Sequence, residues 1–345
     1  METKLIGEGT LKAAVVERLG TVPAYEEVDD PVPGDGMVVA EVRAAAVKNI
    51  ERALVAGSHY GSRQLALPGL IGLDAVAVLP DGRRVYAAAT PPGGAMAERM
   101  LVNPDWSVEL PAEISDPLAA ALPNAAISAW FALEYAGRIQ PGQSVLVLGG
   151  TGVTGALAAQ LAKRRFGAER VVVAGRNVER LDRLAGLGAD ATIRIDRAPA
   201  GGIEPEVRRL HDERPFDLVL DYLWGPPAEQ ALRALGGDDL AAEFHRTRYV
   251  QIGEMAGPTL ELPAGVLRST GIELLGQGGG SVPREAFGRI MTEVLPALFA
   301  MLVDGSVTVD TQVRSLSEVA DAWTAPAPSG VRVVLQPSPG EGSNL

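Results

Sequence analysis

A glycine-rich turn between an apolar strand and a helix constrains this chain more than any other feature. An apolar run typical of a buried strand covers Ser144–Leu148, and residues 155–166 have helical character. Between them lies Gly150-x-Gly152-x-x-Gly155. A lone GxGxxG is a weak signal, but in a strand–turn–helix setting it is typical of a dinucleotide-binding βαβ unit. A turn that binds nothing is the alternative.

Each glycine of this turn has an expected role. We expect Gly150 to allow the tight turn and Gly152 to let the main chain approach a pyrophosphate. Gly155 would let the helix pack close to the strand. The N-terminus of the helix offers free N–H groups and a partial positive charge to phosphate oxygens.

The end of the second strand indicates which dinucleotide fits. It reads Val173-Ala174-Gly175-Arg176-Asn177, without the Asp or Glu that usually binds the ribose 2′-hydroxyl in NAD enzymes. The guanidinium of Arg176 could instead bind a 2′-phosphate through two oxygens, and Gly175 leaves room for it. Arg180 is a second candidate. The pattern favours NADP(H) over NAD(H), unless Arg176 is only a solvated loop residue.

Strands and helices alternate around this turn, which predicts a parallel, doubly wound sheet and hence an α/β Rossmann domain. The expected strands are 144–148, 170–174, 191–195, 218–221, 249–252 and 272–275. The expected helices are 155–166, 178–187, 204–213 and 227–235.

Short strands and turns dominate the first hundred residues, which predicts a small, mostly antiparallel β domain. The expected strands are 12–16, 37–46, 70–79, 84–89 and 95–102, followed by a helix over 116–122 capped by Ser115 and helical spacing over 125–136. Near the end we expect a helix over 284–302, strands over 308–313 and 331–335, a helix over 315–323 between them, and a loose tail over 337–345. The predicted domains are residues 1–122, 123–282 and 283–345, the last returning to the first.

Composition narrows the partners and the compartment. The chain of 345 residues is 47% hydrophobic, enough for a large core, and carries a net charge of −12. An acidic surface repels nucleic acid and anionic membranes. With no cysteine, disulfides and Cys-ligated metals are excluded. We see neither a signal peptide nor a membrane span, and expect a cytoplasmic protein that binds a small-molecule substrate.

The chain resembles the medium-chain dehydrogenase/reductase superfamily, and within it the zinc-independent quinone oxidoreductase branch, over roughly residues 12–336. Besides the glycine turn, the resemblance is carried by residues 45–51, 72–74, 81–86, 121–130, 221–225 and 250–253, which match in order and spacing. It implies a GroES-like substrate domain, a Rossmann domain, hydride transfer and a homodimer.

Departures from the zinc enzymes of this superfamily are informative. Those enzymes carry a Cys near Lys48, a His-Glu pair near Leu73-Asp74 and a four-Cys lobe, whereas this chain has Leu73 and no Cys. The resemblance therefore implies no metal site. Without a Lewis acid, alcohol oxidation loses its electrophile, whereas a quinone or conjugated C=C bond needs less help.

Three residues are candidates for the chemistry: Tyr60, Lys48 and Asn124. Tyr60 lies in a loop that resembles the family's substrate loop, and its phenol could donate to an enolate, although a packed aromatic is the alternative. The neighbouring His59 is a second proton donor. Lys48 aligns with a family Asn, unless Asn49 is the match. Its ammonium could polarise a substrate carbonyl or pair with Glu51 or Asp74, or it could be a surface lysine.

Other candidates lie where open sheets bind ligands. Asn124 and Ser128 begin the helix that runs beside the nicotinamide in the family, although Asn124 could instead bond to the backbone near Pro123. Tyr222 and Trp224 follow one strand and Gly253 another, and residues 276–281 form a lid, a nicotinamide-contacting turn or a hinge. The predicted cofactor set is Gly150, Thr151, Gly152, Val153, Gly155, Gly175, Arg176, Asn177, Tyr222, Gly253 and Ser128.

The resulting hypothesis is an NADPH-dependent reductase that transfers hydride to a quinone or an α,β-unsaturated carbonyl. A carbonyl or enoyl-thioester reductase of a biosynthetic pathway is the nearest alternative. A non-redox protein that only binds NADPH, as a sensor or a cyclase on the same fold, is another.

Overall fold

The computed structural model describes residues 9–34, 36–90, 93–195, 202–236, 244–326 and 328–337. They fall into two compact units. A β unit comprises Met1–Asn124, Met291–Asp304 and Val309–Leu345, and a Rossmann unit comprises Ala125–Ile290 and Gly305–Thr308. The units thus divide at 124/125 and 290/291, where the sequence suggested 122/123 and 282/283.

The Rossmann unit is built on a six-stranded sheet in the order β11-β10-β9-β12-β13-β14. All five strand pairs are parallel. This order and orientation confirm the predicted doubly wound α/β fold. The strands are β9 Ser144–Leu148, β10 Arg170–Gly175, β11 Ala191–Arg194, β12 Leu218–Asp221, β13 Arg246–Gln251 and β14 Gly271–Gly276.

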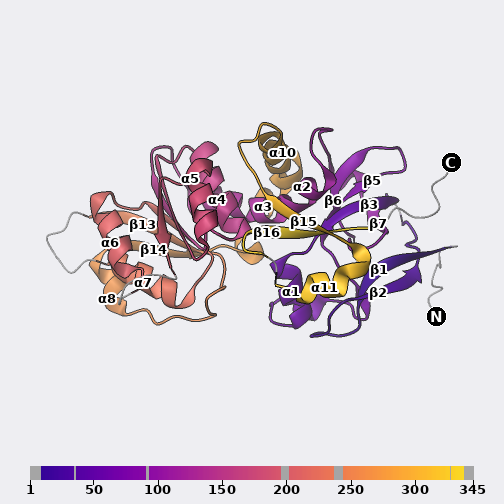
Figure 1. Cartoon of the computed structure of the whole chain (residues 1–345), viewed down its shortest axis with the longest axis horizontal. Coiled ribbons are helices and arrows are strands. Elements are labelled where there is room, and N and C mark those ends of the chain that lie inside the picture. The colour runs from indigo at the N-terminus through magenta and orange to yellow at the C-terminus, as the bar shows by residue number, and fades with distance from the viewer. Residues whose placement is uncertain are drawn as a thin grey trace. The chain divides into compact units, whose positions relative to one another are not determined.

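Helices cover both faces of this sheet, with α4 and α5 on one face and α6 and α7 on the other (Figure 1). The central strands β9 and β12 are buried at every residue, which is why their sequences are continuous apolar runs. The helices are α4 Val153–Arg164, α5 Val178–Leu187, α6 Glu204–Glu213, α7 Gly225–Leu235 and α8 Ala264–Ser269. Leu146 and Leu148 of β9 join residues of α6 and α7 in one apolar core.

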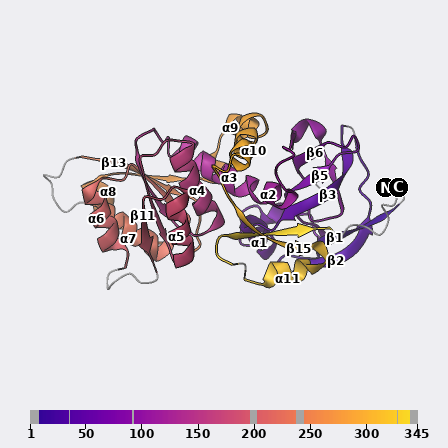
Figure 2. The same ribbon diagram turned by 45° about the horizontal axis from the view of Figure 1, so that its top comes forward.

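The β unit contains a seven-stranded sheet, β15-β16-β3-β5-β6-β8 with β7 also paired to β3, and a three-stranded sheet, β2-β1-β4. Strands β3, β5 and β6 lie side by side (Figure 2). Every pair is antiparallel except β15–β16, as expected for a mostly antiparallel domain. The strands are β1 Thr10–Val16, β2 Ala24–Asp29, β3 Val38–Ala46, β4 Gly69–Leu70, β5 Asp74–Val78, β6 Arg84–Ala88, β7 Arg99–Val102, β8 Ser107–Glu109, β15 Asp310–Ser315 and β16 Val331–Gln336.

Several expectations for this unit were wrong. The helix Asn49–Ala56 and strand β8 were not predicted, and β7 covers only the second half of the strand expected over 95–102. Strand β2 was missed, because its polar sequence gains order only by pairing with β1. The single strand expected over 70–79 is broken into β4 and β5 at Gly72, which adopts a left-handed φ of 106°. A Cβ at Gly72 would lie 2.5 Å from the backbone nitrogen of Met96. The break therefore requires glycine.

The remaining helices connect these layers. They are α1 Asn49–Ala56, α2 Asp116–Ala121, α3 Pro123–Phe131, α9 Arg284–Arg289, α10 Leu295–Val303 and α11 Val319–Thr324. Ser115 precedes α2, but its side chain makes no capping hydrogen bond, contrary to expectation. A π-helical turn, Ala132–Ala136, continues α3.

A second π-helical turn, Ile290–Val294, joins α9 to α10. The resulting helix Arg284–Val303 is, by length and composition alone, long and apolar enough to cross a bilayer. In the β unit its buried residues pack against protein instead, for example Phe299 against Tyr86 with ring centroids 6.2 Å apart. The predicted tail lies outside the described residues from 338 onward.

Candidate functional site

The turn after β9 begins with a glycine that sequence reasoning assigned no role. Gly149 has a left-handed φ of 85°, so it makes the tight turn that was expected of Gly150. Gly150 is needed for a different reason, because a Cβ there would lie 2.1 Å from Cγ1 of Val173 on β10. In the sequence, this role of Gly149 was indicated by its position between the apolar strand and Gly150.

Gly155 sets the distance between α4 and the turn. A Cβ at this position would lie 2.5 Å from the carbonyl oxygen of Gly149 and 2.7 Å from the Cα of Gly150. Real Cβ atoms do not approach backbone this closely, so any side chain would push the helix away from β9. The close packing expected at Gly155 is therefore present.

The N-terminus of α4 emerges from this turn with unused donors. Gly152 is the N-cap, and as in any α-helix the first N–H groups, those of Val153, Thr154 and Gly155, have no carbonyl partner one turn earlier. At Gly152 an added Cβ would approach only the Gly149 oxygen, at 3.4 Å, so the main chain is uncovered. These donors and the helix dipole favour an anion at this point.

The end of β10 supplies a cation beside the turn. Gly175 is buried against Thr151, and a Cβ on it would lie 2.3 Å from the Thr151 Cγ2. The next residue, Arg176, is exposed, and the described part of the chain offers its guanidinium no hydrogen bond or ion pair. Asn177 caps α5, because its Oδ1 accepts from the backbone N–H of Arg180 at 3.0 Å. Arg176 is therefore the residue of this segment that is left to bind a ligand.

A buried carboxylate that the sequence analysis did not single out shapes the loop after β12. Oδ1 of Asp221 accepts from the N–H groups of Leu223 and Trp224, at 2.8 and 3.0 Å. Its Oδ2 accepts from the hydroxyl of Tyr249 on β13 at 2.8 Å. Burial raises the pKa of Asp221, while these three donors oppose that rise. An Asp that ends an apolar strand was the only signal in the sequence.

The backbone of the loop that Asp221 binds has an unusual conformation. Trp224 has a φ of 55°, which a non-glycine residue adopts only at a cost in free energy. Tyr222 is buried, and its hydroxyl has no hydrogen-bond partner among the described residues. A Cβ at Gly253, after β13, would lie 2.7 Å from the carbonyl oxygen of Tyr222. The loops after β12 and β13 are thus packed backbone to backbone.

The parallel sheet brings most of the predicted cofactor residues together. Strands β10, β9, β12 and β13 are consecutive neighbours, so the segments after their carboxyl ends share one edge of the sheet. Ser128 lies on α3, where its hydroxyl donates to Oε1 of Gln277 over a long 3.5 Å. Asn124 lies one helical turn before Ser128, is half-buried and has no side-chain hydrogen bond among the described residues.

Lys48 in the β unit is not a surface lysine. Its side chain is 1% exposed, and its Nζ lies 3.1 Å from each of three oxygens, the Ala46 carbonyl, Glu51 Oε1 and Asp74 Oδ1. The expected pairing with Glu51 and Asp74 is confirmed. The ammonium donates hydrogen bonds to Ala46 and Glu51 and forms an ion pair with Asp74, and it is almost fully buried, so the expectation that Lys48 polarises a substrate carbonyl is wrong.

The surroundings of Lys48 form a buried network of charges. Burial lowers the pKa of Lys48, but the carboxylates of Asp74 and Glu51 outweigh it and raise the pKa overall. Glu51 also accepts from the backbone N–H groups of Lys48 and Leu73, at 2.9 Å each. The buried Arg332 adds a second positive charge near the two carboxylates and donates to the carbonyl of Val47 at 3.2 Å. The network therefore joins β3, α1, β5 and β16.

The other candidate for proton donation is open to solvent. Tyr60 is 76% exposed, so the expected alternative of a packed aromatic is wrong. Its ring lies against His59 with centroids 4.0 Å apart. Nδ1 of His59 accepts from the backbone N–H of Gly61 at 3.0 Å, which leaves Nε2 as the ring's possible donor. Leu73, where zinc enzymes carry His, is 38% exposed.

No group of three or more His, Asp or Glu side chains suited to a metal ion occurs within the described ranges.

No family model matches the chain. Among curated proteins it is 28% identical to "Probable NADPH-dependent quinone reductase tdiC" of Emericella nidulans, over 91% of this chain and 96% of the relative. It is also 32% identical, over 66% of its length, to a segment making up 10% of a phenolphthiocerol synthesis polyketide synthase of Mycobacterium marinum. Among solved structures, the quinone oxidoreductase of Thermus thermophilus, also solved with NADPH, is 29% identical and has a TM-score of 0.75, with 94% of this chain and 99% of that one covered.

A parallel Rossmann sheet together with a mostly antiparallel β unit is the architecture of the medium-chain dehydrogenase/reductase superfamily. The matches along almost the full length confirm the resemblance of the sequence. The similarity of the chain is to the quinone oxidoreductase-like branch of that superfamily.

The close approach at Gly155 gives a test of the turn. We expect Gly155→Ala to lower the free energy of unfolding by roughly 1–3 kcal/mol, because the new Cβ forces α4 off the turn. Gly186→Ala, on the exposed side of α5 with open space around it, is the control and should stabilise by up to about 1 kcal/mol. Urea unfolding followed by circular dichroism measures both. Equal effects of the two substitutions would contradict the packing described here.

The buried lysine gives a second test. Lys48→Met leaves two buried carboxylates without their cation, so we expect a loss of about 3–5 kcal/mol in unfolding free energy. Lys12→Met is the control, because Lys12 pairs with Glu27 at the surface, where such a pair contributes at most about 1 kcal/mol. Thermal unfolding at neutral pH compares them. A loss at Lys48 no larger than that at Lys12 would show that the network does not stabilise the β unit.

Proposed function

We propose that this protein is an NADPH-dependent, zinc-independent reductase whose small-molecule substrate is a quinone or an α,β-unsaturated carbonyl. The observation that carries the proposal is the glycine turn at the N-terminus of α4, with little packed against Gly152, beside Arg176 at the end of β10, whose guanidinium has no partner among the described residues. The named activity of the Emericella nidulans relative supports it.

The residues at this edge fit a phosphorylated dinucleotide. The first N–H groups of α4 would hold the pyrophosphate, which the bare main chain at Gly152 allows to come close. Arg176 would hold the 2′-phosphate. The strand end has no carboxylate that would bind a ribose 2′-hydroxyl, and the guanidinium has no partner among the described residues. Thr151, Val153, Gly175 and Asn177 complete this wall.

We assign hydride donation to the cofactor, and positioning and hydrogen bonding to the protein. When bound, NADPH supplies the hydride. The chain positions the cofactor at the sheet edge, with Tyr222, Gly253 and Ser128 as the proposed nicotinamide-side wall. Tyr60, whose phenol is exposed, is the proposed hydrogen-bond or proton donor to the substrate oxygen, and Asn124 is a proposed second donor. Lys48 contributes structure, through its buried ion pairs.

Independence of zinc is supported by the residues present. The whole chain has no cysteine, and Leu73 stands where a zinc enzyme has histidine. The two carboxylates that could attract a cation, those of Glu51 and Asp74, are already bound by the ammonium of Lys48. A substrate reduced at a conjugated carbon fits such a site, because the developing charge is delocalised onto an oxygen that hydrogen bonds can stabilise.

An enoyl-thioester reductase is the second candidate. It is favoured by the match to a segment of a polyketide synthase, at 32% identity over two thirds of this chain. The net charge of −12 is mildly unfavourable for an anionic carrier.

We also propose a cytoplasmic homodimer. The dimer is supported by β14, which ends the six-stranded sheet and pairs with β13 alone among the described strands, so its outer edge has unused backbone hydrogen-bonding groups.

The activity has a direct test. We expect the purified protein to oxidise NADPH, followed by its absorbance, in the presence of at least one member of a panel of benzoquinones, naphthoquinones and aliphatic enones. Enoyl thioesters should be included to compare the second candidate. Pretreatment with a metal chelator should leave the rate unchanged. Tight binding of NADPH without turnover of any substrate would favour a non-redox protein instead.

Cofactor choice has a separate test. Arg176→Glu replaces a phosphate-binding cation with an anion, so we expect the dissociation constant for NADPH to rise by about tenfold or more and that for NADH to change little. Arg268→Glu, an equally charge-changing substitution at an exposed position on α8, is the control. Titration by cofactor fluorescence measures both constants. Equal losses for NADPH and NADH in Arg176→Glu would refute the role of Arg176.

A further inference from the structure

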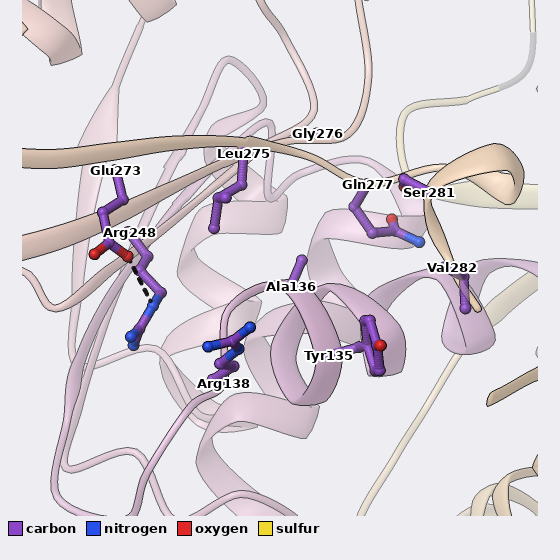
Figure 3. Close-up of a pocket in the computed structure, with 10 residues that line it drawn as sticks. All are labelled: Tyr135, Ala136, Arg138, Arg248, Glu273, Leu275, Gly276, Gln277, Ser281 and Val282. Atoms are coloured by element: carbon purple, nitrogen blue, oxygen red, sulfur yellow. Dashed lines mark ion pairs between the residues drawn. The ribbon is translucent and has the colours of Figure 1, made fainter. Parts of the chain in front are cut away.

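The Rossmann unit contains a cavity of about 240 Å³ beside the edge strand β14. Its walls come from the end of the π-helical turn after α3, from β13 and β14, and from the loop that follows β14. Figure 3 shows the side chains of Arg138 and Arg248 on one side of the cavity and those of Tyr135 and Gln277 on the other, with Leu275 above Arg138 in this view. No member of the predicted cofactor set lines it, but Gly276, Gln277 and Ser281 belong to the loop 276–281, for which contact with the nicotinamide was one expectation.

Positive charge is in excess on one wall. Glu273 is the only carboxylate in the lining, and it is shared by two arginines, with Arg248 Nε at 3.2 Å and Arg246 Nε at 3.3 Å. Arg138 is a third arginine, exposed and without a hydrogen bond or ion pair from its guanidinium to any described residue. The lining thus holds two arginines and one carboxylate, and that carboxylate is also paired with Arg246 outside the lining, on a chain whose net charge is −12.

The backbone holds Arg138 in this place at a cost. Arg138 has a φ of 46°, a left-handed conformation that is unfavourable for a residue with a Cβ. It directly follows Gly137, where a Cβ would lie 2.7 Å from the carbonyl oxygen of Ala132. Strained residues that persist in folded proteins concentrate at ligand sites, because the surrounding structure must compensate for them.

The rest of the lining is suited to a small body that is partly apolar. Leu275, Ala136 and Val282 provide apolar surface, and Tyr135 and Gln277 provide a phenol and an amide. Gln277 is 8% exposed and also receives the long hydrogen bond from Ser128. The volume is below the range of roughly 300–1,000 Å³ usual for sites of drug-sized ligands and cofactors, which points to a small molecule.

We propose that this cavity binds a small organic carboxylate, with the carboxylate on Arg138 and Arg248 and an apolar body against Leu275. A planar guanidinium binds the two oxygens of a carboxylate at once. Arg138, which lines this partly apolar cavity and has no partner among the described residues, is suited to that contact. The site lies entirely within the Rossmann unit, and its lining residue Gln277 contacts Ser128 of the proposed nicotinamide-side wall.

Benzoate is the probe, and uncharged benzamide of the same shape is its control. Isothermal titration calorimetry on the full chain at constant ionic strength should show saturable binding of benzoate and at least tenfold weaker binding of benzamide. Arg138→Gln should weaken benzoate by roughly tenfold, the usual effect of losing a charge-assisted hydrogen bond. Arg268→Gln, which removes an exposed arginine elsewhere on the same unit, should leave benzoate binding unchanged.

Several outcomes would overturn the proposal. They are the absence of saturable benzoate binding, equal affinity for benzoate and benzamide, and equal losses in Arg138→Gln and Arg268→Gln. Competition by inorganic phosphate as strong as that by benzoate would show a general anion site and would contradict the assigned apolar contact. Because Arg138 is exposed, loss of folding in Arg138→Gln is not expected. Leu275→Asn, which makes the apolar wall polar, gives an independent check and should also weaken benzoate.

Discussion

The contact on which the Rossmann unit depends is the approach of α4 to the turn after β9. Three glycines make it possible in different ways: Gly149 by its left-handed φ, Gly150 by leaving room for Val173, and Gly155 by leaving room for the backbone of the turn. The same packing directs the first N–H groups of α4 to the sheet edge. A requirement of packing therefore also produces the donors that the proposed cofactor site uses.

The β unit depends on a different kind of interaction. Its ends are joined by charge, because Lys48, Glu51, Asp74 and Arg332 bring together segments separated by up to 285 residues in the chain. Two positive and two negative side chains balance one another there, which makes burial tolerable. Removing any one of them leaves a buried charge without its counter-charge. The free-energy cost of such a charge keeps the cluster intact.

Most strands and helices of the Rossmann unit could be predicted to within two or three residues, although α8 was missed, because apolar strands such as β9 and amphipathic helices such as α5 carry their own periodicity. Strand β2 could not, since its polar residues become a strand only through pairing with β1. The glycine turn and Arg176 could be singled out from the sequence, because each directly follows a strand within one short segment. Asp221 was missed because its partner Tyr249 lies 28 residues away and nothing local marks the pair.

Charged residues show most clearly what a sequence leaves open. Lys48 and Arg176 were both candidates to bind a ligand, and residue type alone does not separate them. Their surroundings in the structure distinguish them. Three oxygens surround the Lys48 ammonium, whereas the described residues give the Arg176 guanidinium no hydrogen bond or ion pair. A saturated buried charge stabilises a fold, while an unpartnered charge on a rigid element is available to a ligand. The same criterion assigns Arg138 to a ligand and leaves Glu273, held between two arginines, to the protein itself.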